Sequence, residues 1–161
     1  MDTLNVKIER LSETAIAPAY GSTQAAGMDL HADLGYEFAR TTSGLAQFPK
    51  VVEIEPHTTV KVGTGWAMQP PAGYCGLIFA RSGLATKQGL RPANCVGLCD
   101  EDYRGEYIVP LHNDSDETQL IHHGDRIAQV VFVPYQQFAL TEVDELDSTN
   151  RGAGGFGSTG K

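Results

Sequence analysis

The chain has 161 residues, and a single domain of that size buries about two thirds of its unfolded surface, so one domain is expected. Hydrophobic residues make up 41% of the sequence and charged residues 20%, a balance that excludes wholesale disorder. The formal net charge of -8 argues against a general coating of nucleic acid, because such a surface repels a polyanion.

No stretch of the sequence approaches the length and hydropathy of a membrane span, and residues 1–10 alternate apolar and charged side chains instead of forming a signal-peptide core. We therefore expect a cytoplasmic protein that binds neither membranes nor nucleic acid. The three cysteines, Cys75, Cys95 and Cys99, lie within or beside apolar runs, and no second ligand pair follows at zinc-site spacing. Reduced thiols are expected.

Short apolar or β-branched runs, separated by glycines and prolines, dominate the first half of the chain. An opening strand is predicted over residues 4–11, and a strand carrying one inward or ligand-facing acid, Asp29, over residues 26–32. Further strands are predicted at residues 51–54, 58–62, 66–68 and 74–80. This spacing of strands and turns predicts an all-β barrel or sandwich. Residues 35–50 interrupt the pattern and are interpreted as a surface insertion.

A different pattern follows the last of these strands. Ser82 is a candidate N-cap, Leu84 and Ala85 favour a helix, and Gly89 can end it. A short helix beginning beside Arg81 would direct free N–H groups outward next to a guanidinium, which suits phosphate oxygens. A capped surface helix explains the same residues equally well. The Walker phosphate-loop spacing is absent from the sequence, which excludes that type of ATPase or kinase site.

Residues 97–105 carry three acids and one tyrosine between two glycines. Because they lie between apolar runs at residues 94–99 and 107–111, they predict a β-hairpin whose turn faces polar groups. Asp100 ends the first run and is expected to be held partly out of water, a setting that can tune a carboxylate toward general-base work. The side chains expected to shield it are Val96, Leu98 and Cys99. A solvated turn is the simpler interpretation of an isolated Asp-x-Asp pair.

The remaining polar residues of interest lie near the C-terminus. His122 and His123 are adjacent, so an extended chain directs them to opposite sides, and both are expected at the surface. Gln129 lies in an apolar strand and needs a partner, either a core hydrogen bond or a ligand. Residues 151–161 hold five glycines, and a frayed end is their simplest interpretation. The same residues could close over a nucleotide, with Phe156 stacked on a base.

Five segments, in chain order, resemble the five motifs of the trimeric deoxyuridine triphosphatases (dUTPases). They are Ala-Gly-Met-Asp-Leu at 26–30, Arg-Ser-Gly-Leu-Ala at 81–85, the Asn-to-Gly segment at 94–105, Gly-Asp-Arg-Ile-Ala-Gln at 124–129 and the Arg-Gly to Phe-Gly-Ser segment at 151–158. Five matches in order are highly specific, and they extend from near residue 20 to the C-terminus. The departures from the family pattern are Met28, Ala80 and residues 35–50.

The resemblance implies a β-jelly-roll homotrimer, or distorted β-barrel, in which several chains build each site and dUTP is hydrolysed to dUMP and pyrophosphate. Such an enzyme limits uracil in DNA and supplies dUMP for thymidylate synthesis. We predict a dUTPase β-barrel domain over residues 1–149, with residues 35–50 inserted, and a flexible glycine-rich arm over residues 150–161.

Individual roles follow from places in the motifs. Asp100 resembles the base that orients and deprotonates a water for attack on the α-phosphorus. Tyr103 resembles the residue that packs against deoxyribose, and Asp29 a holder of Mg²⁺ through water. A bridging Mg²⁺ is expected because the triphosphate and a nearby carboxylate repel each other. The resemblance assigns to substrate binding Asn94, Gly97, Leu98, Cys99, Ile108 and Phe156 for the base, Arg81, Ser82, Gly83, Gln129, Arg151 and Ser158 for the phosphates, and Gly157 without a more specific role.

Two alternatives remain open from the sequence. A trimeric dCTP deaminase shares the fold and parts of the same motifs, although residues 81–83 and 100–103 are more similar to the triphosphatase form. A dUTPase with an added regulatory role, binding a protein partner through residues 35–50, is the second alternative.

Overall fold

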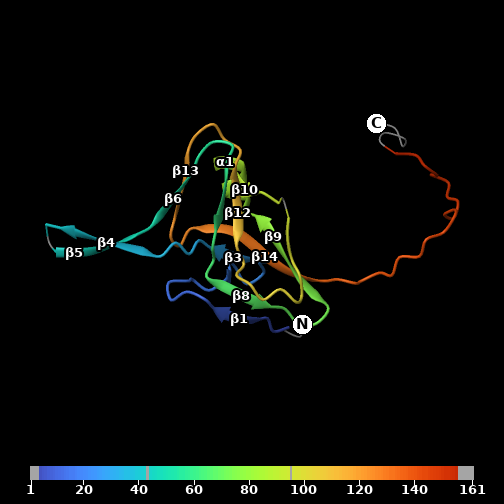
Figure 1. Cartoon of the computed structure of the whole chain (residues 1–161), viewed down its shortest axis with the longest axis horizontal. Helices are drawn as coiled ribbons and strands as arrows, with labels where there is room; N and C mark the ends of the chain where they lie inside the picture. The colour runs from blue at the N-terminus through green and yellow to red at the C-terminus, as the bar shows by residue number, and fades with distance from the viewer. Residues whose placement is uncertain (1–3, 43, 95, 156–161) are drawn as a thin grey trace.

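The structure is a computed structural model that describes residues 4–42, 44–94 and 96–155 (Figure 1). Short strands carry most of its regular structure, and α1 (Ser82–Gln88) is the one helix in these ranges. The strands are β1 (Lys7–Arg10), β2 (Ala19–Tyr20), β3 (Met28–His31), β4 (Tyr36–Thr41), β5 (Gly44–Pro49), β6 (Val51–Ile54), β7 (Thr59–Val62), β8 (Trp66–Gln69), β9 (Tyr74–Ala80), β10 (Leu90–Pro92), β11 (Gly97–Cys99), β12 (Val109–Asn113), β13 (Gln119–His122) and β14 (Arg126–Pro134). The predicted all-β class with one short helix is confirmed.

The strands form several open antiparallel sheets. The largest has the order β11-β9-β14-β3-β2, and a second has the order β10-β12-β7. Side chains from both sheets, including Leu30, Val109 and Val130, are fully buried in one hydrophobic core. β14 lies at the centre of the larger sheet because its apolar run can pair on both edges, with β3 on one side and β9 on the other.

The helix follows directly from β9, as the sequence predicts, and Gly89 ends it. Gly89 adopts a left-handed conformation at φ 67°, and its N–H donates to the Leu84 carbonyl. The N-cap differs from the prediction, because Arg81 occupies it in an extended conformation and makes no side-chain cap. Ser82 is already helical, and its carbonyl accepts the Thr86 hydroxyl at 2.7 Å.

The hairpin predicted around Asp100 is wrong. β11 pairs with β9, whereas β12 pairs with β10 and β7. Residues 100–108 connect two different sheets, and that segment is longer than the two to five residues of an ordinary hairpin turn. The sequence shows two apolar runs but not their partners, since strand pairing depends on contacts far apart in the chain. The acidic segment is therefore an open loop that crosses from one sheet to the other.

β4 and β5 form a ribbon that projects from the body (Figure 1). Among the described strands they pair only with each other, and the Lys50 N–H closes the base on the Gly35 carbonyl at 3.0 Å. Phe38 and Leu45 are 65% and 73% exposed on this ribbon. A regular ribbon thus occupies residues in which no strand is predicted.

His123 anchors the base of this ribbon, and the prediction that it lies at the surface is wrong. Its side chain is 2% exposed, whereas His122 is exposed on the opposite side. The His123 Nδ1 accepts the N–H groups of Leu34 and Gly35, each at 3.2 Å, and its ring packs edge-on against Tyr36. These backbone donors give the buried Nδ1 its polar partners, whereas Nε2 is buried with no hydrogen-bond partner among the described residues.

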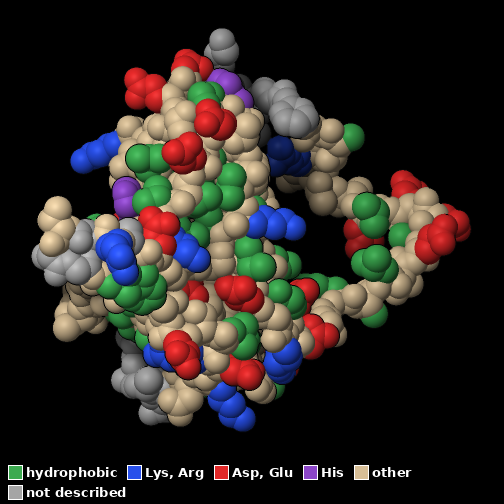
Figure 2. Space-filling model, turned by 60° about the vertical axis from the view of Figure 1, so that its left-hand side comes forward, with side chains coloured by type: hydrophobic (Ala, Val, Ile, Leu, Met, Phe, Trp, Pro, Cys, Tyr) green, Lys and Arg blue, Asp and Glu red, His purple; other side chains and the backbone are tan. Residues whose placement is uncertain are grey.

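Beyond β14 the chain leaves the body as an extended tail (Figure 1). Residues 135–155 contain no helix or strand, and Figure 2 shows this tail standing clear of the body with hydrophobic and acidic side chains along it. Phe138, Leu140 and Leu146 are 79%, 96% and 82% exposed. No helix of the described ranges is long and apolar enough to cross a membrane.

Candidate active site

A cavity of about 210 Å³ brings together many of the residues that the sequence assigns to nucleotide binding. Of the predicted set it is lined by Asn94, Gly97, Leu98, Cys99, Asp100, Tyr103 and Ile108, and Ile78, Glu106 and Tyr107 complete it. β11 and the following loop supply most of this lining, while Ile78 comes from the neighbouring β9. The predicted base site is therefore one continuous concave surface.

Gly97 and Gly105 leave the space that the side chains of Asn94 and Tyr103 occupy at the cavity. A Cβ on Gly97 would approach the Asn94 amide nitrogen to 3.1 Å and Ile78 Cβ to 3.2 Å, so glycine leaves room for the Asn94 side chain at the cavity. A Cβ on Gly105 would overlap the Tyr103 hydroxyl. With glycine there, Tyr103 folds back over its own loop, and its hydroxyl donates to the Glu106 carbonyl at 3.0 Å.

Apart from Asp100 and Glu106, the side chains that line the cavity carry no charge at neutral pH. Tyr107 is 1% exposed, and its backbone N–H donates to the Trp66 carbonyl at 2.8 Å. Burial raises the pKa of the Cys99 thiol to about 11, and burial likewise raises the pKa of the Tyr107 hydroxyl. Both groups are protonated at neutral pH, which suits a flat, uncharged ring.

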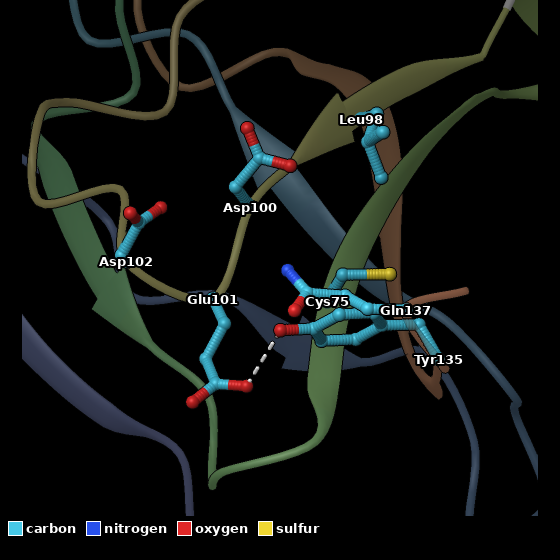
Figure 3. Close-up of a pocket in the computed structure, with 7 residues that line it drawn as sticks. All are labelled: Cys75, Leu98, Asp100, Glu101, Asp102, Tyr135 and Gln137. Atoms are coloured by element: carbon cyan, nitrogen blue, oxygen red, sulfur yellow. Dashed lines mark hydrogen bonds between the residues drawn. The ribbon is translucent and has the colours of Figure 1, made fainter. Parts of the chain in front are cut away.

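Asp100 stands at the edge of this cavity and also lines a second one, of about 470 Å³ (Figure 3). In the single chain its side chain is exposed, and so are those of Val96 (44%) and Leu98 (62%). The expectation that these apolar side chains hold Asp100 partly out of water is therefore wrong for the single chain. They alternate with the buried Gly97, so they lie on the side of the extended chain that faces away from the core.

A second cluster, around Asp29, includes two of the phosphate-binding candidates, Arg81 and Gln129. Asp29 is 9% exposed and accepts hydrogen bonds from two arginines, from Arg81 Nε at 2.9 Å and from Arg126 Nη1 at 3.2 Å. Gln129 pairs with Asp29 across β14 and β3, and its side chain lies against Gly27, where a Cβ would approach the amide oxygen to 3.2 Å. No described residue hydrogen-bonds to that amide, which leaves it open to a ligand.

Some predicted residues are not brought to the site in one chain. Arg151 belongs to the tail beyond β14, where its Nε donates to the Gly154 carbonyl at 2.8 Å. Phe156, Gly157 and Ser158 lie outside the described residues. The arm over residues 150–161 and the roles assigned to it stay predictions.

Sequence reasoning missed Arg126, Glu106 and Tyr107. Arg126 lies within the fourth motif segment, but only the fold shows that it shares Asp29 with Arg81. The Glu106 carboxylate accepts the Gly65 N–H at 2.7 Å and so fixes the end of the Asp100 loop. No sequence signal identifies that bond, because residues 65 and 106 meet only in three dimensions.

A cavity lined mostly by uncharged groups beside an exposed carboxylate suits an uncharged ring next to a reacting group, and arginines held by a buried aspartate suit an anion. Together they indicate the class of nucleotide-binding enzymes. The chain belongs to the dUTPase family, since the dUTPase family model matches residues 13–160.

Relatives support the same assignment. The deoxyuridine 5'-triphosphate nucleotidohydrolase of Desulfitobacterium hafniense (strain DSM 10664 / DCB-2) is 44% identical over 163 residues, covering 99% of each chain. The dUTPase of Staphylococcus bacteriophage 80alpha, solved with dUPNHPP, superposes with a TM-score of 0.77 at 27% identity, covering 99% of this chain and 100% of that one. The fold is therefore the jelly roll of this family.

A third comparison concerns a metal. A mutant dUTPase of phage phi11 of S. aureus, whose structure shows the coordination of a structural Mg(II) ion, shares the fold with a TM-score of 0.71 at 24% identity. This likeness covers 89% of this chain and 99% of that one. Magnesium is thus found within the family.

Proposed function

We propose that this protein hydrolyses dUTP to dUMP and pyrophosphate. The observation that carries the proposal is the gathering of six motif residues and Ile108 around one cavity, with the Asp100 carboxylate at its edge. Family membership and the names of the relatives support the same reaction. The dCTP deaminase alternative is not favoured by any of these comparisons. The product dUMP serves thymidylate synthesis, and removal of dUTP limits uracil in DNA.

Asp100 is the proposed base. No described side chain or backbone group hydrogen-bonds to its carboxylate, so the carboxylate is free to accept a proton from a water molecule. That water attacks the α-phosphorus, the bond to the bridging oxygen breaks, and pyrophosphate leaves while the Asp100 carboxyl holds the proton. Position at the edge of the cavity is what this role requires, because a carboxylate there lies next to the sugar and phosphates of a nucleotide whose ring fills the cavity.

The cavity is proposed to select the nucleotide. The Asn94 amide and the backbone of Gly97, Leu98 and Cys99 offer hydrogen-bonding groups to uracil, and Ile108 lines the same space. Tyr103, folded back over its loop, is proposed to pack against the deoxyribose and leave no room for a 2'-hydroxyl. A buried site of this kind discriminates well, since a wrong base leaves its polar groups unpaired.

The arginine cluster is proposed to bind the phosphates. The Arg81 Nε donates to Asp29 at 2.9 Å and its Nη1 donates to the Arg126 carbonyl at 3.4 Å, which leaves the other N–H groups of the guanidinium for phosphate oxygens. Ser82 and Gly83 follow at an exposed position, and a Cβ on Gly83 would meet nothing within 4 Å, so the backbone there is open to a ligand. Gln129 completes this group on the neighbouring strand.

Magnesium fits the site as an ion brought by the nucleotide. The described residues contain no cluster of three or more ligating side chains, while Asp100 and Asp102 supply exposed carboxylate oxygens of the kind Mg²⁺ prefers. Both oxygens of Asp29 accept arginine hydrogen bonds, so its proposed role in holding the ion through water is indirect. The ion, when bound between phosphates, offsets their negative charge.

The working enzyme is proposed to be a homotrimer whose barrel domain spans residues 1–149. The arm over residues 150–161 would bring Arg151, Phe156, Gly157 and Ser158 over the pocket of a neighbouring chain. The extended path of the tail away from the body of its own chain supports this (Figure 1). We also propose a cytoplasmic location, where the nucleotide pool lies, and a binding site for a protein partner on the β4–β5 ribbon.

Pyrophosphate release measured across the deoxynucleoside triphosphates tests the reaction. We expect release from dUTP in the presence of Mg²⁺, with dCTP, dTTP, dATP and dGTP lower by orders of magnitude. An ammonia assay with dCTP separates the deaminase alternative, and clear ammonia release would contradict the proposal.

A further inference from the structure

The loop that carries Asp100 has little strand pairing of its own. Within residues 100–108 one isolated bridge, between Glu106 and Ala67, is present. Glu106 holds the end of the loop remote from Asp100 through the Gly65 N–H. The end next to Asp100 depends on Glu101.

Glu101 belongs to a closed network with Gly73 and Tyr135, which we call the Glu101 latch. Its Oε2 accepts the Gly73 N–H at 2.7 Å and the Tyr135 hydroxyl at 2.9 Å. The Tyr135 N–H in turn donates to the Gly73 carbonyl at 3.0 Å. Figure 3 shows the Glu101 side chain reaching to Tyr135 and away from the Asp100 carboxylate. The latch joins three segments: the turn before β9, the Asp100 loop and the beginning of the tail.

The protonation states of Glu101 and Tyr135 at neutral pH favour the hydrogen bonds of the Glu101 latch. The Gly73 N–H, followed by the Tyr135 hydroxyl, lowers the pKa of Glu101, so the carboxylate stays ionised. The hydrogen bond to Glu101 raises the pKa of Tyr135, so the hydroxyl stays a donor. Hydrogen bonds to an ionised acceptor are shorter and stronger than neutral ones, which strengthens both contacts of the Glu101 carboxylate. The Arg104 Nη1 also donates to the Glu101 carbonyl, at 2.7 Å.

We propose that Glu101 is a positioning residue that sets the direction of Asp100 through Gly73 and Tyr135. The two residues share one planar peptide group, so fixing the Glu101 side chain limits rotation of the backbone on which Asp100 stands. The Asp100 carbonyl accepts the Tyr103 N–H at 3.2 Å, and the orientation of Asp100 is thereby joined to that of the sugar-binding tyrosine. This inference rests on the proposed function of Asp100 as the base.

Four variants test the latch. Glu101→Ala removes the acceptor. Glu101→Gln keeps an oxygen that can accept the hydrogen bonds from Gly73 and Tyr135, so it is the conservative variant that should restore the function lost in Glu101→Ala. Tyr135→Phe removes one donor and keeps the ring. Tyr20→Phe is its matched control, since Tyr20 is an exposed tyrosine whose hydroxyl bonds to no described residue.

The measurement is steady-state hydrolysis of dUTP by the full chain, with kcat separated from KM and with folding checked by thermal melting. A misplaced base lowers kcat, so we expect Glu101→Ala to lose roughly ten- to a hundred-fold in kcat with KM changed by less than about threefold. Glu101→Gln should retain kcat within about fivefold, Tyr135→Phe should lose about three- to tenfold, and Tyr20→Phe should match the wild type. Because both changes break one network, the Glu101→Ala, Tyr135→Phe double variant should lose little more than Glu101→Ala alone.

A purely structural role would lower the melting temperature and leave kcat per folded chain unchanged. Glu101→Ala with kcat within twofold of the wild type, or Tyr135→Phe equal to Tyr20→Phe, would overturn the inference. Were Glu101→Ala not to fold, the tyrosine pair would decide by itself. A wild-type chain that releases no pyrophosphate from dUTP would instead overturn the proposed function, whatever the variants did.

Discussion

Asp100 and Asp102 differ in their surroundings although they are two residues apart. Asp100 borders both cavities, whereas Asp102 borders only the larger one. Asp100→Asn keeps the shape of the side chain and removes proton acceptance. We therefore expect dUTP binding to survive while kcat falls by roughly 10²–10⁴, the usual loss when general-base help is removed.

Single-turnover kinetics and equilibrium binding of a non-hydrolysable analogue measure the two effects of Asp100→Asn separately. Asp102→Asn is the matched control and should be milder. A larger loss for Asp102→Asn than for Asp100→Asn would show that the base is assigned to the wrong carboxylate.

Gly105 determines where the Tyr103 ring lies. Because a Cβ at residue 105 would overlap the Tyr103 hydroxyl and ring, Gly105→Ala must displace the tyrosine. We expect KM for dUTP to rise by about tenfold and discrimination against UTP to weaken, since the residue proposed to exclude a 2'-hydroxyl has moved. Competition kinetics with dUTP and UTP give both quantities.

Gly21→Ala is the control for Gly105→Ala, because a Cβ there makes only an ordinary contact, at 3.7 Å from Asp29. Unchanged discrimination in Gly105→Ala would mean that Tyr103 is not the residue that reads the sugar.

Sequence patterns predict the relative orientation of neighbouring residues better than they predict contacts between residues far apart in the chain. The opposite directions of His122 and His123 follow from alternation along an extended chain, and the structure confirms them. That His123 is the buried one does not follow, because its partners, the N–H groups of Leu34 and Gly35, come from a distant segment. Asp29 is recognisable as a special acid, yet its two arginine partners are visible only in the fold.

At the scale of elements, the sequence predicts a strand or helix correctly where local residues indicate both its apolar segment and the position where it ends. β9 spans the predicted residues 74–80, and Gly89 ends α1 as predicted, because an apolar run and a left-handed glycine are local features. The loop after β11 fails as a hairpin because nothing local specifies that β9 is the partner of β11. The ribbon β4–β5 is missed because Thr, Ser and Gly residues obscure its alternation.

The β4–β5 ribbon shares no strand pairing with the described elements that form the site. It pairs with no other described strand, and Gly35 and Lys50 meet at its base with an N···O distance of 3.0 Å. Replacing residues 36–49 by a two-residue Asn-Gly turn should therefore close the chain without strain. We expect dUTP turnover to stay within a few fold of the wild type, measured by pyrophosphate release.

The control is a chain that keeps its native ribbon but carries Phe38→Ser and Leu45→Ser. These changes remove two exposed apolar side chains, so they show whether a gain in solubility alone alters the measured turnover. Loss of turnover in the shortened chain with its fold intact by circular dichroism would show that the ribbon contributes to the site.

At the scale of the whole molecule, the tail that precedes the arm extends away from the body that carries Asp100 (Figure 1). Two inactive variants test whether different chains supply them: Asp100→Asn with an intact arm, and a chain that ends before Arg151 with an intact Asp100. After joint refolding at equal amounts, about a quarter of the sites in a symmetric ring combine an intact base with an intact arm from another chain. We expect dUTP turnover to recover to about a quarter of the wild-type rate.

An arm that serves its own chain restores nothing, because no single chain in the mixture has both parts. Turnover at the background of the separate variants, with mixed trimers confirmed by native mass spectrometry, would exclude a shared site.

The extended tail also bears on how long a newly synthesised chain survives. Its large apolar side chains, 79% to 96% exposed at Phe138, Leu140 and Leu146, resemble an unfolded segment to proteases and chaperones. In the proposed homotrimer neighbouring chains would cover them, whereas a solitary chain leaves them exposed. Degradation should therefore slow as synthesis rises, so that the cellular amount of this enzyme responds more than proportionally to the supply of its messenger RNA.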